Sequence, residues 1–400
     1  MPLIKETRMN TGKLPPIAPK GPVADLLKEA QSVWLDTISR HLMDSGELAE
    51  LIGSVGIRGI TSNPTIFEKA INGSSDYDAE ISRLARENHS PTEIIRLLMV
   101  EDVRRACDFF RPIYDSSSFG DGYVSIEVNP LLAHDTEESV LEARTLHQMV
   151  DRPNLLVKIP GTPEGIPAIR QLISEGISIN VTLLFSPDAY RKAAMAYIEG
   201  LRDYVSKGHN PARVHSVASL FISRLDTLVD RKLEEIAASA SDPMLAKKAA
   251  SLLGMAGIAN TQIVYENFEK LFDKKIFGNL ASHGARVQRP LWASTGTKNP
   301  KYSDILYVQN LIGPDTVNTV PAETLRAFAD HGKAIRTIDR YKEDRALPNP
   351  HEVLEKIQNI GISLEAAYNQ LIREGVEAFN KSFESLLAST EKKIASIRKG

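Results

Sequence analysis

The sequence predicts an α/β protein, a (β/α)8 TIM barrel with additional C-terminal helices. Short β-rich runs alternate with segments of helical periodicity, and this alternation implies parallel strands joined by right-handed crossovers. Eight such runs are found, which is the number that closes a TIM barrel. Several runs also carry polar residues on one face, near their C-terminal ends. A doubly wound open sheet is the alternative that the alternation leaves open.

The candidate strands are short, rich in β-branched residues and bounded by turn residues. They cover Ser32–Thr37, Arg58–Ser62, Tyr123–Val128, Asn154–Ile159, Ile177–Leu184, Val214–Ser219, Arg289–Ser294 and Thr316–Val320. Apolar residues recur at helical spacing in the segments that follow the strands. Examples are Glu137–Val150, Thr162–Ser174, Ser186–Ser206 and Ala322–His331.

No linker rich in Gly, Ser or Pro interrupts the middle of the chain. We therefore expect residues 26–400 to form a single barrel domain that includes the C-terminal helices, preceded by a flexible N-terminal arm over residues 1–25. An apolar helical stripe follows residue 351, which is more often packed on the protein body than used as an oligomer contact. Its members are Leu364, Tyr368, Leu371, Phe379, Phe383 and Leu386. A monomer and a homodimer both fit this pattern.

The composition excludes several classes of protein. Acidic and basic residues nearly cancel, with a formal net charge of −3, so we expect no nucleic-acid partner. No apolar run is long enough to span a membrane, and the N-terminal segment lacks the apolar region of a secretory signal. These features predict a cytoplasmic protein. The single cysteine, Cys107, cannot form an intrachain disulfide or a cysteine zinc site and has the spacing of a core residue.

Polar residues alternate with apolar ones along several candidate strands. Successive side chains of a strand point to opposite faces, so Asn180 and Thr182 share a face and Val181 lies opposite. In a barrel the polar faces would point inward, near the C-terminal strand ends where barrel active sites are built. An antiparallel sheet with one wet face is the alternative, but helical segments after the strands argue against it. The inward residues expected on this basis are Asp36, Asn63, Glu127, Lys158, Asn180 and Thr182.

Lys158 has the most specific chemistry of this set. A lysine inside a low-dielectric cavity is available as a neutral amine, which can form a Schiff base with a ketone. The resulting iminium accepts electrons when the adjacent carbon–carbon bond is cleaved. Asp36 and Glu127 would supply carboxyls for separate acid and base roles. The uncharged residues that suit a polyol are Asn63, Asn180 and Thr182. A lysine that reaches solvent or pairs with Glu127 is the structural alternative.

Two later segments suit a phosphate group. Ser219 and Arg224 lie where the sixth candidate strand gives way to a helix, and Ser294 and Lys298 follow the seventh. Helix N-termini and late barrel loops are favourable anion sites, and arginine can bind phosphate with two parallel hydrogen bonds. The substrate expected from these residues together with Lys158 is a small sugar phosphate.

Five motifs of this chain, in their order, resemble those of the transaldolase family. They are Gly-Ile-Thr-Ser-Asn-Pro-Thr-Ile-Phe over 59–67, Ser-Ile-Glu-Val-Asn-Pro over 125–130, Leu-Val-Lys-Ile-Pro over 156–160, Ile-Asn-Val-Thr-Leu-Leu-Phe-Ser over 179–186 and Trp-Ala-Ser-Thr-Gly-Thr-Lys-Asn over 292–299. The resemblance runs from about Ser32 to the C-terminal helices, and the last motif is similar to the longer-chain bacterial and plant branch.

The resemblance implies a TIM barrel without a metal or organic cofactor, acting in the pentose phosphate pathway. It implies transfer of a dihydroxyacetone unit from a ketose phosphate to an aldose phosphate. In one such reaction, sedoheptulose 7-phosphate and glyceraldehyde 3-phosphate give erythrose 4-phosphate and fructose 6-phosphate. A class I aldolase that releases free dihydroxyacetone and a non-catalytic sugar-phosphate binding barrel remain as alternative functions.

The resemblance also implies a role for each candidate residue. Lys158 would form the Schiff base and Asp36 would be the acid/base at the cleaved bond, while Glu127 would activate water that Thr182 orients. The holders of the three-carbon unit would be Asn63 and Asn180, and the phosphate contacts Ser219, Arg224 and Ser294. Shorter relatives carry an arginine where this chain has Gly296, and Lys298 is the expected replacement.

Overall fold

The computed structural model describes residues 19–397, and its eight parallel strands close into a barrel in sequence order. The strands are β1 (Gln31–Leu35), β2 (Gly59–Ile60), β3 (Tyr123–Glu127), β4 (Leu155–Pro160), β5 (Ile179–Leu184), β6 (Ser216–Phe221), β7 (Arg289–Ala293) and β8 (Thr316–Val320). β8 pairs with β1 along the whole length of both strands, from Gln31 opposite Thr316 to Leu35 opposite Val320. The predicted barrel is therefore confirmed, and the open-sheet alternative is wrong.

The strands differ from their predicted bounds at the ends, and most in β2. β2 keeps only two paired residues because the chain turns at once into the next helix. In that turn Asn63 accepts a hydrogen bond from the Ile66 N–H and Pro64 opens the helix. Gly59 must be a glycine, since a Cβ there would lie 2.7 Å from the Trp34 indole. The early end of β2 brings the Asn63 side chain to the mouth of the barrel.

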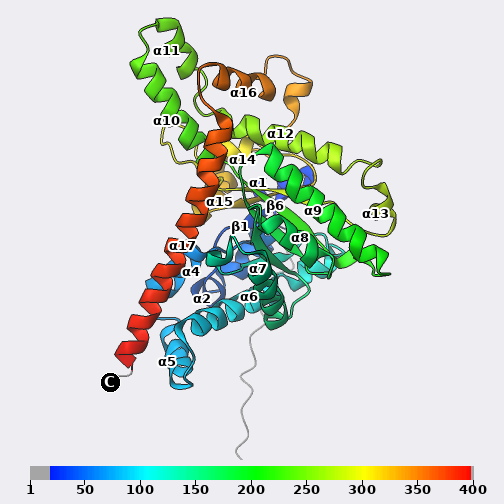
Figure 1. Ribbon diagram of the computed structural model, residues 1–400, viewed down its shortest axis with the longest axis vertical. Helices are drawn as coiled ribbons and strands as arrows, with labels where there is room; N and C mark the ends of the chain where they lie inside the picture. The colour runs from blue at the N-terminus through cyan, green and yellow to red at the C-terminus, as the bar shows by residue number, and fades with distance from the viewer. Residues whose placement is uncertain (1–18, 398–400) are drawn as a thin grey trace, which may run out of the picture.

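Helices surround the barrel (Figure 1). The larger ones are α4 (Pro64–Gly73), α5 (Asp78–Arg86), α6 (Pro91–Ser116), α7 (Thr136–Val150), α8 (Gly165–Ile173), α9 (Pro187–Ser206), α10 (Ser223–Ser239), α12 (Ala256–Leu271), α15 (Ala322–His331), α16 (Pro350–Asn359) and α17 (Leu364–Ile397). The shorter ones are α1 (Pro22–Asp25), α2 (Arg40–Asp44), α3 (Glu47–Glu50), α11 (Pro243–Ala250), α13 (Gly278–Ser282) and α14 (Leu306–Asn310). Single turns are η1 (Leu26–Glu29), η2 (Leu51–Val55), η3 (Pro130–Leu132), η4 (Pro211–Arg213) and η5 (Arg340–Lys342). Residues 1–18 of the predicted arm lie outside the described residues.

The C-terminal helix α17 is the largest addition to the barrel. Figure 1 shows it as a long red rod that passes α4 and ends near α5. It packs on α4, α5, α6 and α10, and it also touches the end of β5. The C-terminal helices therefore reach the end of the barrel at which the strands finish.

The core has two parts: one lies between the strands and the outer helices, and the other extends from the barrel interior to α10, α16 and α17. Outward residues such as Ile126, Val157 and Val181 pack against the helices. Inward residues such as Trp34 and Leu156 pack against one another and fill the barrel below the strand ends. This alternation leaves the polar inward positions at the C-terminal ends. Cys107 is fully buried in the outer core, as its spacing predicted. Within residues 19–397 no helix is both long and apolar enough to cross a membrane.

Candidate active site

A cavity of about 600 Å³ opens at the C-terminal end of the barrel. All but two of the predicted site residues line it, although they come from six strands or strand ends. They are Asp36, Asn63, Lys158, Thr182, Ser219, Arg224, Ser294 and Lys298. The other two, Glu127 and Asn180, lie directly behind the lining and are hydrogen-bonded to lining residues.

Lys158 lies in the middle of β4 and points into this cavity. Its side chain is only 6% exposed, so the amine does not reach bulk solvent. Nζ donates a hydrogen bond of 2.9 Å to the Ser62 carbonyl oxygen and lies 3.4 Å from Glu127 Oε2. Glu127 is in register with Lys158 on the neighbouring strand β3, which fixes this pair without any loop. The amine is therefore held by two acceptors at the wall of the cavity.

The two carboxyls near Lys158 keep their protons to higher pH than usual. Burial raises the pKa of Glu127, and the adjacent charge of Lys158 opposes this shift. Burial also raises the pKa of Asp36, opposed by its hydrogen bond from Thr61 and by the charge of Lys158. Thr61 Oγ1 donates to Asp36 Oδ1 at 2.7 Å. Each carboxyl can thus give up or accept a proton near the amine.

Behind the cavity, inward polar side chains of β3, β5 and β6 bond to one another. Asn180 donates from Nδ2 to Ser125 Oγ at 3.0 Å and accepts from Ser219 Oγ at 2.7 Å. Thr182 has no such neighbour: its Oγ1 is buried, and within the described residues it has no hydrogen-bond partner. An unpaired buried hydroxyl is costly, so this atom is suited to bind a ligand or water. Asn180 is held rigidly, whereas Thr182 is free to bind.

The side-chain oxygen of Asn63 is used in a hydrogen bond, whereas within the described residues its amide nitrogen is not. Its Oδ1 caps α4 by accepting from the Ile66 N–H at 2.9 Å. The side-chain amide nitrogen remains as a donor, and Asn63 lines the cavity. The same residue thus caps α4 and leaves N–H donors at the cavity.

The opposite wall of the cavity is cationic. Arg224, in the first turn of α10, is half-buried and lies 5.1 Å above the Phe221 ring. Within residues 19–397 its guanidinium has no hydrogen-bond partner. Ser294 adopts a left-handed backbone with φ of 55°, and its Oγ lies 2.8 Å from Ser223 Oγ. Lys298 is exposed at the rim. Unpaired cations and hydroxyls at the start of a helix can bind a phosphate group by donating hydrogen bonds to its oxygens.

Among the lining residues that were not predicted as site residues, three lie close to Asp36 or Lys158. Thr319 Oγ1 lies 2.6 Å from Thr61 Oγ1 and extends the bonding from Asp36 to β8. The alternation of polar and apolar residues along β8 could not identify Thr319, because Asn318 and Thr319 are both polar. Thr61 lies two positions before Asn63 in the motif over 59–67. Phe379 of α17 is buried, and its ring centroid lies 5.9 Å from Lys158 Nζ. The sequence pattern assigned Phe379 to the packing stripe, and no local signal distinguishes it.

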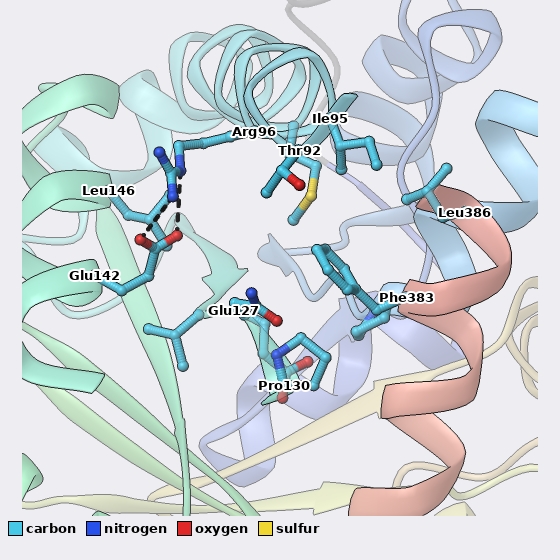
Figure 2. Close-up of a pocket in the computed structure, with 13 residues that line it drawn as sticks. Thr92, Ile95, Arg96, Glu127, Pro130, Glu142, Leu146, Phe383 and Leu386 are labelled. Atoms are coloured by element: carbon cyan, nitrogen blue, oxygen red, sulfur yellow. Dashed lines mark hydrogen bonds and ion pairs between the residues drawn. The ribbon is translucent and has the colours of Figure 1, made fainter. Parts of the chain in front are cut away.

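A second, much smaller cavity of about 30 Å³ lies outside the barrel wall, between α6, α7, the end of β3 and α17. Figure 2 shows Arg96 of α6 paired with Glu142 of α7 on one side and Phe383 and Leu386 of α17 on the other. The ion pair joins Arg96 Nη2 to Glu142 Oε2 at 3.0 Å. The space suits about two water molecules, not a sugar. We therefore interpret it as a packing gap in the surface on which α17 lies, which we call the seat of α17 and which is formed by α6, α7 and the end of β3.

Comparison with known proteins gives one consistent family. The profile of the Transaldolase/Fructose-6-phosphate aldolase family matches residues 33–390. The protein named "Transaldolase" of Trichodesmium erythraeum (strain IMS101) is 44% identical over 369 residues, which cover 92% of this chain and 96% of that protein. The "Transaldolase" of Mycolicibacterium smegmatis (strain ATCC 700084 / mc(2)155) is 45% identical over 377 residues, which cover 94% of this chain and 98% of that protein.

Proposed function

This chain belongs to the Transaldolase/Fructose-6-phosphate aldolase family, and from this membership and the site geometry we propose that it is a transaldolase of the pentose phosphate pathway. It moves a dihydroxyacetone unit between sugar phosphates, from sedoheptulose 7-phosphate or fructose 6-phosphate to an aldose phosphate. The observation that carries the proposal is the buried Lys158 amine, which faces a polar cavity of about 600 Å³ beside two carboxyls. The names of the relatives support it.

In the first step the Lys158 amine adds to the ketone carbon. The former carbonyl oxygen leaves as water, and a carbon–nitrogen double bond forms with a positive charge on the nitrogen. Glu127 lies 3.4 Å from Nζ, and its raised pKa keeps a proton available for the departing oxygen. The free hydroxyl of Thr182 is suited to orient the water that leaves and later returns.

In the second step the bond between the third and fourth carbons breaks. Asp36 takes the proton of the hydroxyl on the fourth carbon, the bonding electrons move toward the iminium nitrogen, and an aldose phosphate leaves. The three-carbon enamine stays on Lys158. It then attacks the carbonyl carbon of an acceptor aldose phosphate, Asp36 returns the proton, and hydrolysis releases the new ketose. No electron leaves the system, so no redox cofactor is needed.

The other predicted residues bind the substrate. Asn63 presents amide hydrogens to the three-carbon unit, and Asn180 holds Ser219 in place from behind. The phosphate contacts are Ser219, Arg224, Ser294 and Lys298. Lys298 stands in for an arginine as a single positive charge without the planar fork. Ser294, held by Ser223, supplies a hydroxyl beside it.

We further propose that residues 26–400 act as one domain, as a monomer or homodimer in the cytoplasm, without a nucleic-acid partner. The support is the small net charge of −3 and the packing of α17 on the barrel helices. Light scattering of the purified protein checks the oligomeric state.

The proposal is tested with an acceptor assay. Fructose 6-phosphate and erythrose 4-phosphate are mixed with the wild type and with Lys158→Met, and sedoheptulose 7-phosphate is measured. We expect transfer by the wild type and none above background by the variant, because methionine fills the same space without an amine. Free dihydroxyacetone formed without acceptor, as fast as transfer, would instead favour an aldolase. Binding of fructose 6-phosphate without either reaction would favour a binding protein.

A further inference from the structure

The helix α17 contributes to the reaction centre although it is not part of the barrel. Gly375 of α17 lies directly on the end of β5, where a Cβ would be 2.9 Å from Leu183 Cδ2. This close approach brings the next turn of α17 over the cavity. Phe379 in that turn is 4% exposed and lines the cavity. Its ring centroid lies 5.9 Å from Lys158 Nζ, with the amine over the ring.

The position of the Phe379 ring is fixed from the C-terminal side of α17. Phe383, one turn later, fills the seat between α6 and the end of β3, together with Leu386 (Figure 2). From Ser382 onward, side chains of α17 bond to α4 and α5 in a regular series. The pairs are Ser382 with Thr65 at 2.7 Å, Ser385 with Glu68 at 2.5 Å, Ser389 with Asn72 at 2.6 Å and Lys393 with Asp78 at 2.6 Å. The ring is thus held where it is in the free protein.

The proposed reaction places a positive charge where this ring lies. Addition of the amine to the ketone, with one proton taken up and one water released, leaves a cationic iminium nitrogen at Lys158. The nitrogen has Glu127 Oε2 and the Ser62 carbonyl oxygen as its polar neighbours. The Phe379 ring is its aromatic neighbour. The face of an aromatic ring attracts a cation within about 6 Å of its centroid, and most strongly where water is excluded.

We propose that the ring face of Phe379 stabilises the positively charged iminium nitrogen of Lys158. This inference rests on the proposed Schiff-base function and adds a residue from outside the barrel to it. A space-filling residue would need only bulk, and leucine would serve as well. An electrostatic partner needs the electron-rich ring face, and leucine would not replace it.

The experiment replaces Phe379 while its shape is kept. Phenylalanines with one, two and three ring fluorines weaken the charge of the ring face in steps with little change in size. Each protein is mixed with a fixed concentration of fructose 6-phosphate below saturation and reduced with borohydride, and the modified fraction of Lys158 is measured by peptide mass mapping. We expect the iminium population to fall stepwise with fluorination, and Phe379→Leu to lower it about three- to tenfold. Phe379→Tyr, which keeps the ring, should stay near the wild type.

Phe383→Leu is the matched control. It lies on the same helix and loses the same ring, while the four polar pairs to α4 and α5 still hold α17 in place, and it does not line the cavity that Lys158 faces. We expect it to lower the melting temperature and leave the modified fraction of folded protein near the wild-type value. A fluorine series without a trend overturns the inference while the wild-type adduct still supports the function. A wild type without an adduct, although substrate binds, overturns both.

Discussion

The two walls of the active-site cavity are built in different ways. The lysine wall, made by Glu127, Lys158 and Asn180, is carried by three adjacent strands in register. Its amine and carboxyl groups are buried and bonded to protein atoms. The arginine wall, made by Arg224, Ser294 and Lys298, is carried by a helix start and a loop, and its cations lack partners within the described residues. Prearranged groups suit chemistry, whereas unpaired cations suit binding. Changes at the lysine wall should therefore act on kcat, and changes at the arginine wall on KM.

The largest effect is expected for Asp36, which acts together with the lysine wall. Asp36→Asn removes the proton acceptor for bond cleavage but keeps the shape and the Thr61 hydrogen bond. We expect kcat to fall about a thousandfold, within the range of general acid–base catalysis. Schiff-base formation should continue, so borohydride should trap the uncleaved six-carbon ketose on Lys158 in place of a three-carbon unit. A variant that still cleaves at more than a tenth of the wild-type rate would contradict the role of Asp36.

A buried carboxyl next to the arginine wall, that of Asp226, should make the free energy of unfolding of the protein depend on pH. Asp226 lies near Arg224 on α10, and burial raises its pKa to about 7. Above about pH 4 the unfolded chain ionises this group while the folded protein keeps it protonated, so stability falls as pH rises to about 7 and stays lower above it. Asp226→Asn removes this term and can still accept from the Gly257 N–H. Its stability relative to the wild type, measured by urea unfolding, should rise by up to about 4 kcal/mol between pH 4 and pH 8. A difference independent of pH would show that Asp226 does not titrate in this window.

Arg224 is the main test of the binding role of its wall. Arg224→Ala should raise KM for fructose 6-phosphate about a hundredfold, the loss expected for charge-assisted bonds to a phosphate, and change kcat less than threefold. Arg224→Lys should recover part of the loss, because it restores the charge but not the planar fork. Steady-state kinetics with a phosphate-free ketose provide the control, since the difference between variants should disappear there. A fall in kcat with an unchanged KM would place Arg224 with the catalytic groups.

The smallest effect is expected for Lys298 at the exposed rim. A solvated charge contributes about 1 kcal/mol or less, so Lys298→Ala should raise KM about three- to fivefold. The effect should shrink when the ionic strength is raised from 0.05 M to about 0.5 M, because salt screens exposed charges. Kinetics at the two salt concentrations measure this. A loss as large as that of Arg224→Ala would mean that Lys298 fully replaces the arginine of shorter relatives.

The same contrast explains what could be predicted from the sequence. Alternation along strands correctly placed Lys158, Glu127 and Thr182 inside the barrel, since a strand fixes the direction of each side chain. It could not show that Asn180 lies behind the lining residues. Alternation predicts the face to which a side chain points, but not how far below the cavity surface it lies. Loops lack the two-residue alternation of strands, so the left-handed backbone of Ser294 could not be predicted in this way. The approach of α17 to Lys158 joins residues more than two hundred positions apart and follows from tertiary packing alone.

The covalent role of Lys158 is tested by borohydride reduction of the wild type in the presence of fructose 6-phosphate, followed by peptide mass mapping. We expect a reduced three-carbon adduct on Lys158 and on no other lysine. A Lys158 peptide that stays unmodified, while calorimetry shows that fructose 6-phosphate binds, would contradict the covalent mechanism.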